Sequence, residues 1–289
     1  MLYTLQNDRF AASVNDLGAE LWSLRDRRSG REYIWQGDAR YWTGRSPVLF
    51  PIVGRLKDDA YLVNGRQYRM KKHGFARGAC FAPGLDGEGG LTMTLESSEQ
   101  TLAQYPFRFR LSLRYRLDEE GLEVEYLVAN PSEKEELLFS LGAHPALCCQ
   151  LGDTLRFERR ETQDAWRLGG EQGLLLPERT PLLRDQDRLT ITKELVAADA
   201  LILEGQSSGY VELERQGGEG NVRVCFGRTP CLGLWAKPGA PYVCVEPWFG
   251  LDDGPEGGGE LRCKKHVQRL QPGGRFHFQL RILPQPAGA

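Results

Sequence analysis

Apolar and polar residues alternate with a period of two along much of this chain. In residues 107–117, phenylalanine, leucine or tyrosine occupies every second position, and arginine or serine stands between them. After Asp118-Glu119-Glu120-Gly121 the alternation resumes in residues 122–128 and stops at Asn130-Pro131. Successive side chains of a strand point to opposite faces, so these segments predict two half-buried strands joined in an antiparallel hairpin.

The same pattern recurs in residues 222–226 and 276–282, and glycine and proline divide the chain into short segments. Such punctuation is typical of turns in an all-β fold. No amphipathic helix longer than about three turns is apparent, and the glycine-rich residues 254–259 lack the Lys-Ser/Thr of a phosphate-binding loop. We predict an all-β protein, a large antiparallel β-sandwich that forms a single domain over residues 1–289.

Composition excludes several classes of protein. A formal net charge of -2 argues against a nucleic-acid partner, which usually requires a basic surface. No apolar run is long enough to span a bilayer, and residues 1–8 lack the basic and apolar regions of a signal peptide. The seven cysteines include no CxxC pair, so we expect free thiols and a cytoplasmic location.

Candidate chemistry stands out where polar residues interrupt apolar segments. Five such residues are Arg55, His73, His144, Asp199 and Glu246. His144 is surrounded by leucine, alanine and proline, and Glu246 ends a run of apolar, strand-like residues. A histidine and a glutamate in one cleft can give and take a proton near neutral pH, so this pair predicts general acid–base chemistry.

Each of these residues also has a purely structural interpretation. Arg55 would form a salt bridge at the edge of the core, and His73 would belong to an exposed basic loop beside Lys71 and Lys72. His144 would be a core histidine with a hydrogen-bond partner, and Asp199 would cap the start of a strand. A carboxylate at the position of Glu246 is costly unless it is paired or functional.

Tryptophan and phenylalanine residues accompany these positions. Trp235 and Trp248 flank the segment of Glu246, and Trp42 and Phe75 lie near the other candidate loops. Flat apolar faces beside hydrogen-bonding groups suit a sugar, which has both C–H patches and hydroxyls. Core packing is the alternative for each single ring.

At these residues the sequence resembles the aldose 1-epimerases or galactose mutarotases, and especially their LacX-like bacterial branch. The matching segments, in order, are Arg45-Ser46-Pro47-Val48-Leu49-Phe50-Pro51-Ile52-Val53-Gly54-Arg55, Lys72-His73-Gly74-Phe75-Ala76-Arg77, Gly142-Ala143-His144-Pro145-Ala146, Ala198-Asp199-Ala200-Leu201 and Val245-Glu246-Pro247-Trp248-Phe249-Gly250. Each motif alone is weak, but the ordered set covers nearly the whole chain and is specific. The resemblance implies a β-supersandwich with an open cleft for a free aldohexose.

The resemblance also implies a role for each matching residue. Glu246 matches the general base that takes the proton of the anomeric hydroxyl, and His144 matches the general acid that protonates the ring oxygen. His73 matches a histidine that binds near the ring oxygen, while Arg55 and Asp199 match residues that hold sugar hydroxyls. We add Trp235 as a substrate-binding residue. No cofactor or metal is expected, because opening a hemiacetal ring needs only proton transfer.

Two departures from the family pattern affect substrate recognition. Galactose mutarotases have an asparagine before the arginine, where this chain has Gly54. Their sugar-binding glutamine has no counterpart near Leu232-Gly233-Leu234-Trp235. A site that lacks such contacts loses discrimination between hydroxyl patterns more readily than it loses chemistry.

Three other functions fit the same residues. The first is a non-catalytic sugar-binding or sensing protein on the same fold, since fold does not determine function. The second is a metal-dependent hydrolase whose ligands would be His73, His144, Asp199 and Glu246, although no closely spaced HxxxH or HxH motif occurs. The third is a phosphosugar epimerase, for which Arg45, Lys71, Lys72 and Arg77 are candidate members of a cationic cluster. The oligomeric state is not readable.

Overall fold

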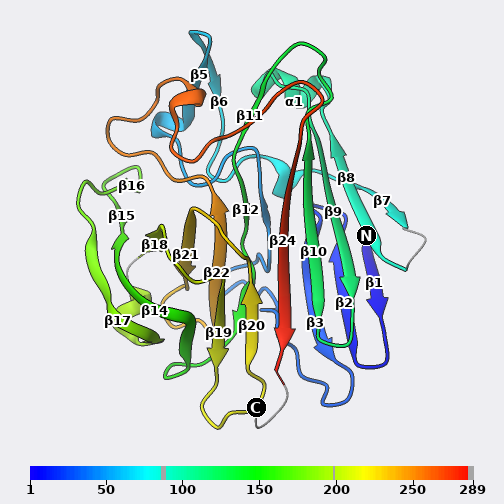
Figure 1. Cartoon of the computed structure of the whole chain (residues 1–289), viewed down its shortest axis with the longest axis vertical. Helices are drawn as coiled ribbons and strands as arrows, with labels where there is room; N and C mark the ends of the chain where they lie inside the picture. The colour runs from blue at the N-terminus through cyan, green and yellow to red at the C-terminus, as the bar shows by residue number, and fades with distance from the viewer. Residues whose placement is uncertain (86–88, 198, 286–289) are drawn as a thin grey trace.

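The computed structural model describes residues 1–85, 89–197 and 199–285, and most of its regular structure is β-strand. One large sheet curves across the whole molecule, with several small sheets packed against it (Figure 1). Within the described part, every ladder between two strands of the sheets is antiparallel. The predicted all-β, antiparallel sandwich is therefore confirmed.

The large sheet contains, in spatial order, β4 (Val48–Leu49), β12 (Leu141–Ala143), β22 (Tyr242–Phe249), β21 (Cys231–Trp235), β18 (Leu201–Glu204), β14 (Thr154–Trp166), β19 (Tyr210–Glu214), β20 (Val222–Cys225), β24 (Arg275–Pro284), β10 (Leu122–Ala129), β9 (Arg110–Leu117), β8 (Leu91–Glu96) and β7 (Ala82–Leu85). Off this path, β13 (Ala146–Cys148) pairs with β22, and β17 (Thr180–Thr190) pairs with β14.

The small sheets consist of β1 (Leu2–Gln6), β2 (Phe10–Asn15) and β3 (Glu20–Asp26); β5 (Ala60–Val63) and β6 (Arg66–Arg69); β11 (Leu137–Phe139) and β23 (Gln268–Leu270); and β15 (Leu168–Gly169) and β16 (Leu174–Leu175). The helices are α1 (Glu99–Gln104) and α2 (Lys193–Ala197), with 3₁₀ turns at Lys57–Asp59, Ala76–Gly78 and Leu261–Cys263. No described helix has the length and apolar character needed to cross a membrane.

The hairpin predicted from the alternating pattern is formed by β9 and β10. Their register pairs Leu117 with Leu122, and the side chains of Leu111, Leu113 and Tyr115 are buried as expected. The predicted start at residue 107 is wrong, because the ladder begins at Arg110. Residues 105–107 instead form a tight turn in which the N–H of Phe107 donates to the carbonyl oxygen of Tyr105 at 2.8 Å.

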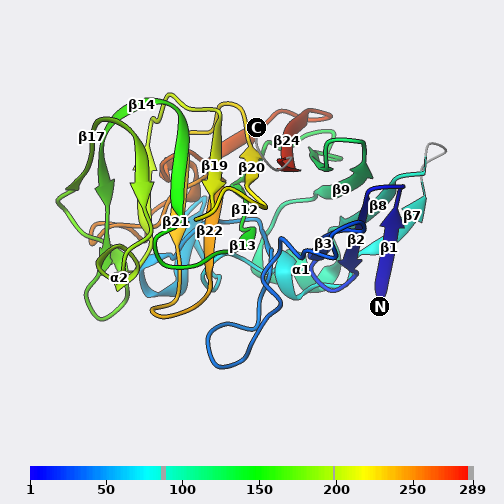
Figure 2. The same ribbon diagram turned by 90° about the horizontal axis from the view of Figure 1, so that it is seen from below.

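The N-terminal sheet lies beside β8 and β9 and covers part of the core (Figure 2). Phe10, Ala12 and Val14 of β2 are fully buried and belong to the same apolar cluster as Leu111 and Leu113 of β9. The hydroxyl of Tyr115 donates to the carbonyl oxygen of Ala19, which ties the two sheets together. Burial of this apolar surface is the main force that holds the layers in place.

The remaining sequence predictions on structure agree with the described chain. The glycine-rich residues 254–259 contain no strand or helix, and all seven cysteines have free thiols. His266 lies beside Glu204 and the exposed His277 beside Glu125, in packing and surface positions respectively. The assignment of residues 1–289 to one domain remains a prediction.

Candidate active site

His144 faces Glu246 because of the way two short strands pair with β22. In β12, Gly142 pairs with Trp248, and in β13, Ala146 pairs with Cys244. The break between these strands contains His144, two positions from each partner, and the residue midway between Trp248 and Cys244 on β22 is Glu246. The backbone register thus brings together two side chains that are distant in the sequence.

Nε2 of His144 and Oε2 of Glu246 are 3.1 Å apart. Their side chains are only 10% and 1% exposed. The two atoms are not aligned as a hydrogen bond, and Oε2 has no hydrogen-bond partner among the described residues. An oxygen in this position is available to accept a proton from a bound molecule.

Burial favours the neutral form of both Glu246 and His144. It raises the pKa of Glu246 well above its usual range, while Lys72 acts in the opposite direction. It lowers the pKa of His144 to about 3, and Lys72 and Arg77 add to this effect. In the neutral pair Glu246 carries the proton that the two groups exchange, and this proton can pass to His144 when a polar ligand enters the site.

Nδ1 of His73 is hydrogen-bonded to the backbone, and Nε2 is available to bind a ligand. Nδ1 accepts a hydrogen bond of 3.1 Å from the N–H of Gly54, and the N–H of His73 donates to the carbonyl oxygen of Gly54 at 2.9 Å. Burial lowers the pKa of His73 well below 6.5, so the ring is neutral. A neutral ring that accepts at Nδ1 carries its proton on Nε2, which makes Nε2 a hydrogen-bond donor.

Asp252 supports the backbone next to His73. Its Oδ1 accepts a hydrogen bond of 2.6 Å from the N–H of Arg55, and burial raises the pKa of this carboxyl group. Gly54 has a φ of +74°, and a Cβ at this position would lie 2.3 Å from Oδ2 of Asp252. The absence of a side chain at Gly54 thus makes room for a carboxyl group that comes from a distant part of the chain.

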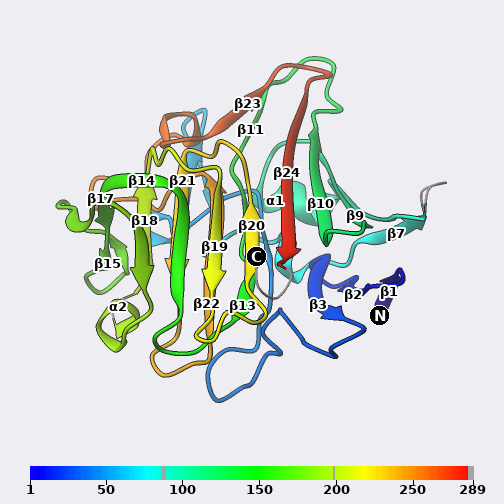
Figure 3. The same ribbon diagram turned by 60° about the horizontal axis from the view of Figure 1, so that its bottom comes forward.

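Aromatic rings surround the His144 imidazole. The ring centroids of Trp42 and Trp235 lie 5.0 Å and 5.8 Å from the centroid of the His144 ring. The centroids of the two tryptophan rings are 5.3 Å apart, in an edge-on arrangement. Trp42 belongs to the long connection between β3 and β4, which runs beside β13 and β22 (Figure 3). This connection is held by a 2.9 Å hydrogen bond from the N–H of Trp35 to the carbonyl oxygen of Ala146.

These residues line one cleft of about 450 Å³. Five predicted site residues contribute to its walls: His73, His144, Asp199, Trp235 and Glu246. The others are Trp42, Lys72, Arg77, Ala197, Ala200, Ala236, Lys237, Pro238 and Trp248. A volume of this size accommodates one monosaccharide, with aromatic faces and hydrogen-bonding groups on its walls.

Arg55 and Asp199 were predicted to hold sugar hydroxyls, and their positions support this role less directly than those of the other predicted site residues. Arg55 is half-buried and is not among the residues that line the cleft, although its N–H is held by Asp252. Asp199 is exposed beside β18, and its own Oδ1 accepts from the N–H of Ala200 at 2.9 Å, as a residue at the start of a strand does. A role for either residue in holding sugar hydroxyls stays a prediction. Ala198, in the same sequence motif, lies outside the described residues.

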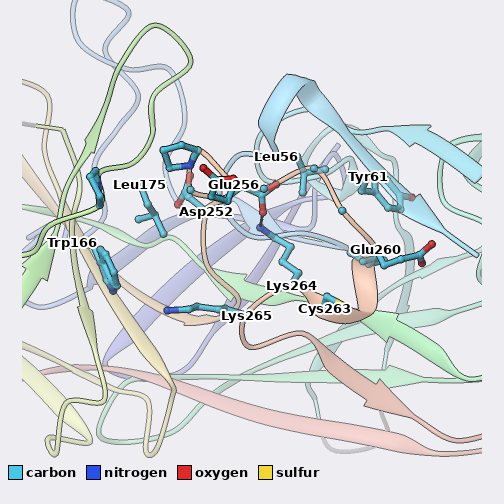
Figure 4. A pocket seen from close by; sticks show the side chains of 18 of the residues that line it. Leu56, Tyr61, Trp166, Leu175, Asp252, Glu256, Glu260, Cys263, Lys264 and Lys265 are labelled. Carbon is cyan, nitrogen blue, oxygen red and sulfur yellow. Dashed lines mark hydrogen bonds and ion pairs between the residues drawn. The ribbon is translucent and has the colours of Figure 1, made fainter. Parts of the chain in front are cut away.

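A second cavity of about 500 Å³ lies along the glycine-rich residues 254–259 (Figure 4). Its walls include Leu56, Trp166, Leu175 and Lys264, but none of the predicted site residues. Lys264 is not free to bind a ligand there, because its Nζ lies 2.6 Å from Oδ1 of Asp253. We call this space the loop cavity, to distinguish it from the cleft.

Only one group within the described chain has the donor atoms of a metal site. It consists of His144, Cys244 and Glu246, whose ligand atoms lie within 4.8 Å of one another. His73 and Asp199, the other two ligands of the hydrolase hypothesis, are not part of it. Burial raises the pKa of the Cys244 thiol well above 9, which disfavours the thiolate that metals bind.

Comparison with known proteins identifies the family. The model of the aldose 1-epimerase family matches residues 1–250. The chain belongs to this family. It is 32% identical over 287 residues to the chromosomal protein LacX of Lactococcus lactis, with 94% of this chain and 95% of LacX covered. The resemblance to the aldose 1-epimerases and their LacX-like branch is thus confirmed.

Solved structures show the same relationship. A galactose mutarotase related enzyme from Lactobacillus acidophilus has a TM-score of 0.92 and 28% identity, covering 99% of this chain and 98% of that chain. A galactose mutarotase-like protein from Lactobacillus casei has a TM-score of 0.88 and 27% identity, covering 99% and 100%. The galactose mutarotase-like fold therefore extends over essentially the whole described chain.

Two residues at or next to the cleft of this aldose 1-epimerase family member escaped sequence reasoning. Asp252 does not line the cleft but holds the backbone of Arg55; an acidic residue after the apolar run that ends in Leu251 gave a usable signal, but this contact joins segments far apart in the chain. Lys237 follows Trp235-Ala236 in a turn and looks like any solvent-exposed lysine. Its place in the cleft depends on the pairing of β21 with β22.

Proposed function

We propose that this protein is an aldose 1-epimerase, or mutarotase, which interconverts the α and β anomers of an aldose with a free anomeric hydroxyl. The observation that supports this function is the buried His144–Glu246 pair at the wall of a monosaccharide-sized cleft. The substrate is an aldohexose, the reaction needs no cofactor or metal, and the location is cytoplasmic.

The reaction requires one group that accepts a proton and one that donates it. Glu246 takes the proton of the C1 hydroxyl while His144 gives its proton to the ring oxygen, so the C1–O5 bond breaks and C1 becomes an aldehyde. Rotation about C1–C2 exposes the other face of the carbonyl. Return of both protons closes the ring as the other anomer and restores Glu246 and His144 to their initial states.

The remaining cleft residues position the sugar. The Nε2–H of His73 donates to the ring oxygen region, which directs that atom toward His144. The faces of Trp42 and Trp235 cover the C–H patches of the ring, and Asp199 and Arg55 hold hydroxyl groups. Because the groups come from different segments held by backbone hydrogen bonds, they are oriented before the substrate binds.

Anomer exchange measured by proton NMR tests the proposal. The rate of conversion of fresh α-D-glucose and α-D-galactose is measured with wild type, Glu246→Gln and His144→Ala. Each rate is corrected for spontaneous mutarotation. We expect acceleration by wild type and a loss of at least about 100-fold in each variant.

A matched control uses the His277–Glu125 pair, whose ring nitrogen and carboxylate oxygen are 3.3 Å apart on the exposed surface of β24 and β10. The His277→Gln and Glu125→Gln variants should keep wild-type rates. Saturable binding of a sugar without any acceleration of exchange by wild type would instead support a non-catalytic sugar-binding protein.

A further inference from the structure

Trp248 shares one face of β22 with Glu246. The two residues are two positions apart in the strand, so their side chains point to the same side, and both line the cleft. Trp248 is nevertheless only 2% exposed. The ring therefore offers little surface to a sugar, and its contacts within the sheet determine what it does.

Two glycines on the neighbouring strands make room for the indole ring. Gly142 of β12 pairs with Trp248, and Gly233 of β21 pairs with Glu246 (Figure 1). A Cβ at Gly142 would lie 2.8 Å from Cδ1 of Trp248, and one at Gly233 would lie 3.2 Å from Cε2. Nε1 is bonded to both of these ring carbons. The N–H edge of the ring therefore lies between the two glycines, across the strand that carries Glu246.

This indole N–H is a buried donor beside a buried acceptor. Nε1 of Trp248 and Oε2 of Glu246 both lack a hydrogen-bond partner among the described residues. Burial raises the pKa of Glu246, whereas Lys72 and the Trp248 side chain both act to lower it. The N–H is thus close enough to favour the ionised carboxylate without being aligned on it. Such contacts tighten when charge develops during a reaction.

Titratable groups from several elements also face Glu246. Asp252 and Asp199 raise its pKa further. The titratable residues around it are Lys72, His73, Arg77, His144, Asp199, Lys237, Tyr242, Cys244 and Asp252. The indole N–H differs from all of these because it does not titrate. Its effect on Glu246 is therefore the same at every pH.

We propose that Trp248 is a positioning residue, whose indole N–H donates to the ionised carboxylate of Glu246 and holds it toward the anomeric hydroxyl. The effect on rate rests on the proposed function. The reactive form has Glu246 ionised and His144 protonated, which is the reverse of the neutral pair. A hydrogen bond to the carboxylate stabilises this form.

The pH profile of kcat/KM for anomer exchange tests the proposal in Trp248→Phe, which removes the N–H. At neutral pH we expect kcat/KM to fall about tenfold, because a smaller fraction of the protein holds the reactive form. The alkaline limb should move up by about one pH unit. Above this limb the rates of variant and wild type should converge, because Glu246 is then ionised in both.

Trp166→Phe is the matched control. Its indole N–H also donates to a carboxylate, that of Glu204 at 2.9 Å, but Trp166 does not line the cleft. This variant should keep the wild-type profile. A shift of the alkaline limb in Trp166→Phe equal to that in Trp248→Phe would overturn the proposal.

A second replacement separates the N–H from the packing of the ring. Benzothienylalanine incorporated in place of Trp248 keeps the shape of the side chain and has sulfur where the indole has N–H. It should reproduce the profile of Trp248→Phe. A wild-type profile with this residue, or a fall in kcat/KM by the same factor at every pH, would overturn the proposal and leave Trp248 a packing residue.

A titration without substrate distinguishes this inference from the proposed function. Carboxyl ¹³C NMR of glutamate-labelled protein follows Glu246, whose signal is absent in Glu246→Gln. We expect Trp248→Phe to lower the acid dissociation constant of Glu246 about tenfold. If no aldose exchanges faster with wild type, the epimerase assignment fails and this titration still tests the hydrogen bond. Equal dissociation constants in Trp248→Phe and wild type would contradict the inference whatever the activity.

Discussion

His144 and Glu246 stand opposite each other at the break between two strands that both pair with β22. The 3.1 Å approach of the imidazole to the carboxyl group is therefore a consequence of backbone register rather than of a flexible loop. Strands tolerate little sliding, because a shift of one residue turns every side chain to the opposite face. The pair is held in place by the sheet itself.

Burial of His144 makes stability depend on pH. Its folded pKa of about 3 is below the unfolded value of 6.5, so the unfolded state binds more protons in this window and stability falls as the pH falls from 6.5 toward 3. We expect His144→Gln to lose less stability than wild type over this range, by up to about 1.4 kcal/mol per pH unit. Urea denaturation at a series of pH values measures the difference.

Glu246 contributes to the pH dependence of stability with the opposite sign. Burial raises its folded pKa above 4.5, so the folded state binds more protons and stability from this group rises as the pH falls toward 4.5. The Glu246→Gln variant should therefore lose more stability than wild type on acidification, where His144→Gln loses less. Parallel pH profiles for the two variants and wild type would contradict the assignment of a buried, neutral pair.

Gly54→Ala should destabilise the protein and impair the site. The new Cβ would lie 2.3 Å from Asp252, on a backbone with a φ of +74°, so we expect a loss of about 2–4 kcal/mol in the free energy of unfolding. Gly65→Ala is the matched control, since its φ is +77° and nothing lies within 4 Å of the added atom. It should lose only about 1 kcal/mol, the cost of the backbone conformation. Equal losses would show that the contact with Asp252 is unimportant.

Trp235→Ala should weaken sugar binding more than it slows the chemistry. The ring lies beside His144 and Trp42 at the wall of the cleft, and removing its apolar face should raise KM about five- to fiftyfold with a smaller change in kcat. Trp166→Ala, at the wall of the loop cavity (Figure 4), should leave KM near the wild-type value. A large rise in KM for Trp166→Ala alone would move the sugar site to the loop cavity.

Chelation should leave anomer exchange unchanged. The candidate metal ligands His144, Cys244 and Glu246 include a buried thiol whose pKa burial raises well above 9, and the proposed proton transfers need no metal. Dialysis against EDTA followed by NMR measurement of exchange tests this expectation, with Cys244→Ala as the matched variant. Loss of activity that added Zn²⁺ restores in wild type, but not in Cys244→Ala, would establish a metal-dependent reaction.

The local pattern of the sequence was sufficient to predict the hairpin of β9 and β10 and to select the candidates for acid–base chemistry. The alternation in residues 107–117 and 122–128 indicates burial directly, because consecutive side chains of a strand point to opposite faces and one face is buried. Polar residues in apolar segments, such as His144 and Glu246, could also be recognised, because burying them is costly unless they are paired or functional. The start of β9 was misjudged, because a turn at residues 105–107 also buries aromatic side chains.

Only the tertiary structure decided which residues share the cleft. The hydrogen bond from the N–H of Arg55 to Asp252 and the position of Lys237 at the wall of the cleft arise from pairings between segments far apart in the chain. Local periodicity carries no information on such pairings. The sequence by itself therefore determined the strand content and the catalytic candidates, while long-range strand register decided the geometry of the pair and the charge around it, because register is set by packing of the whole sheet.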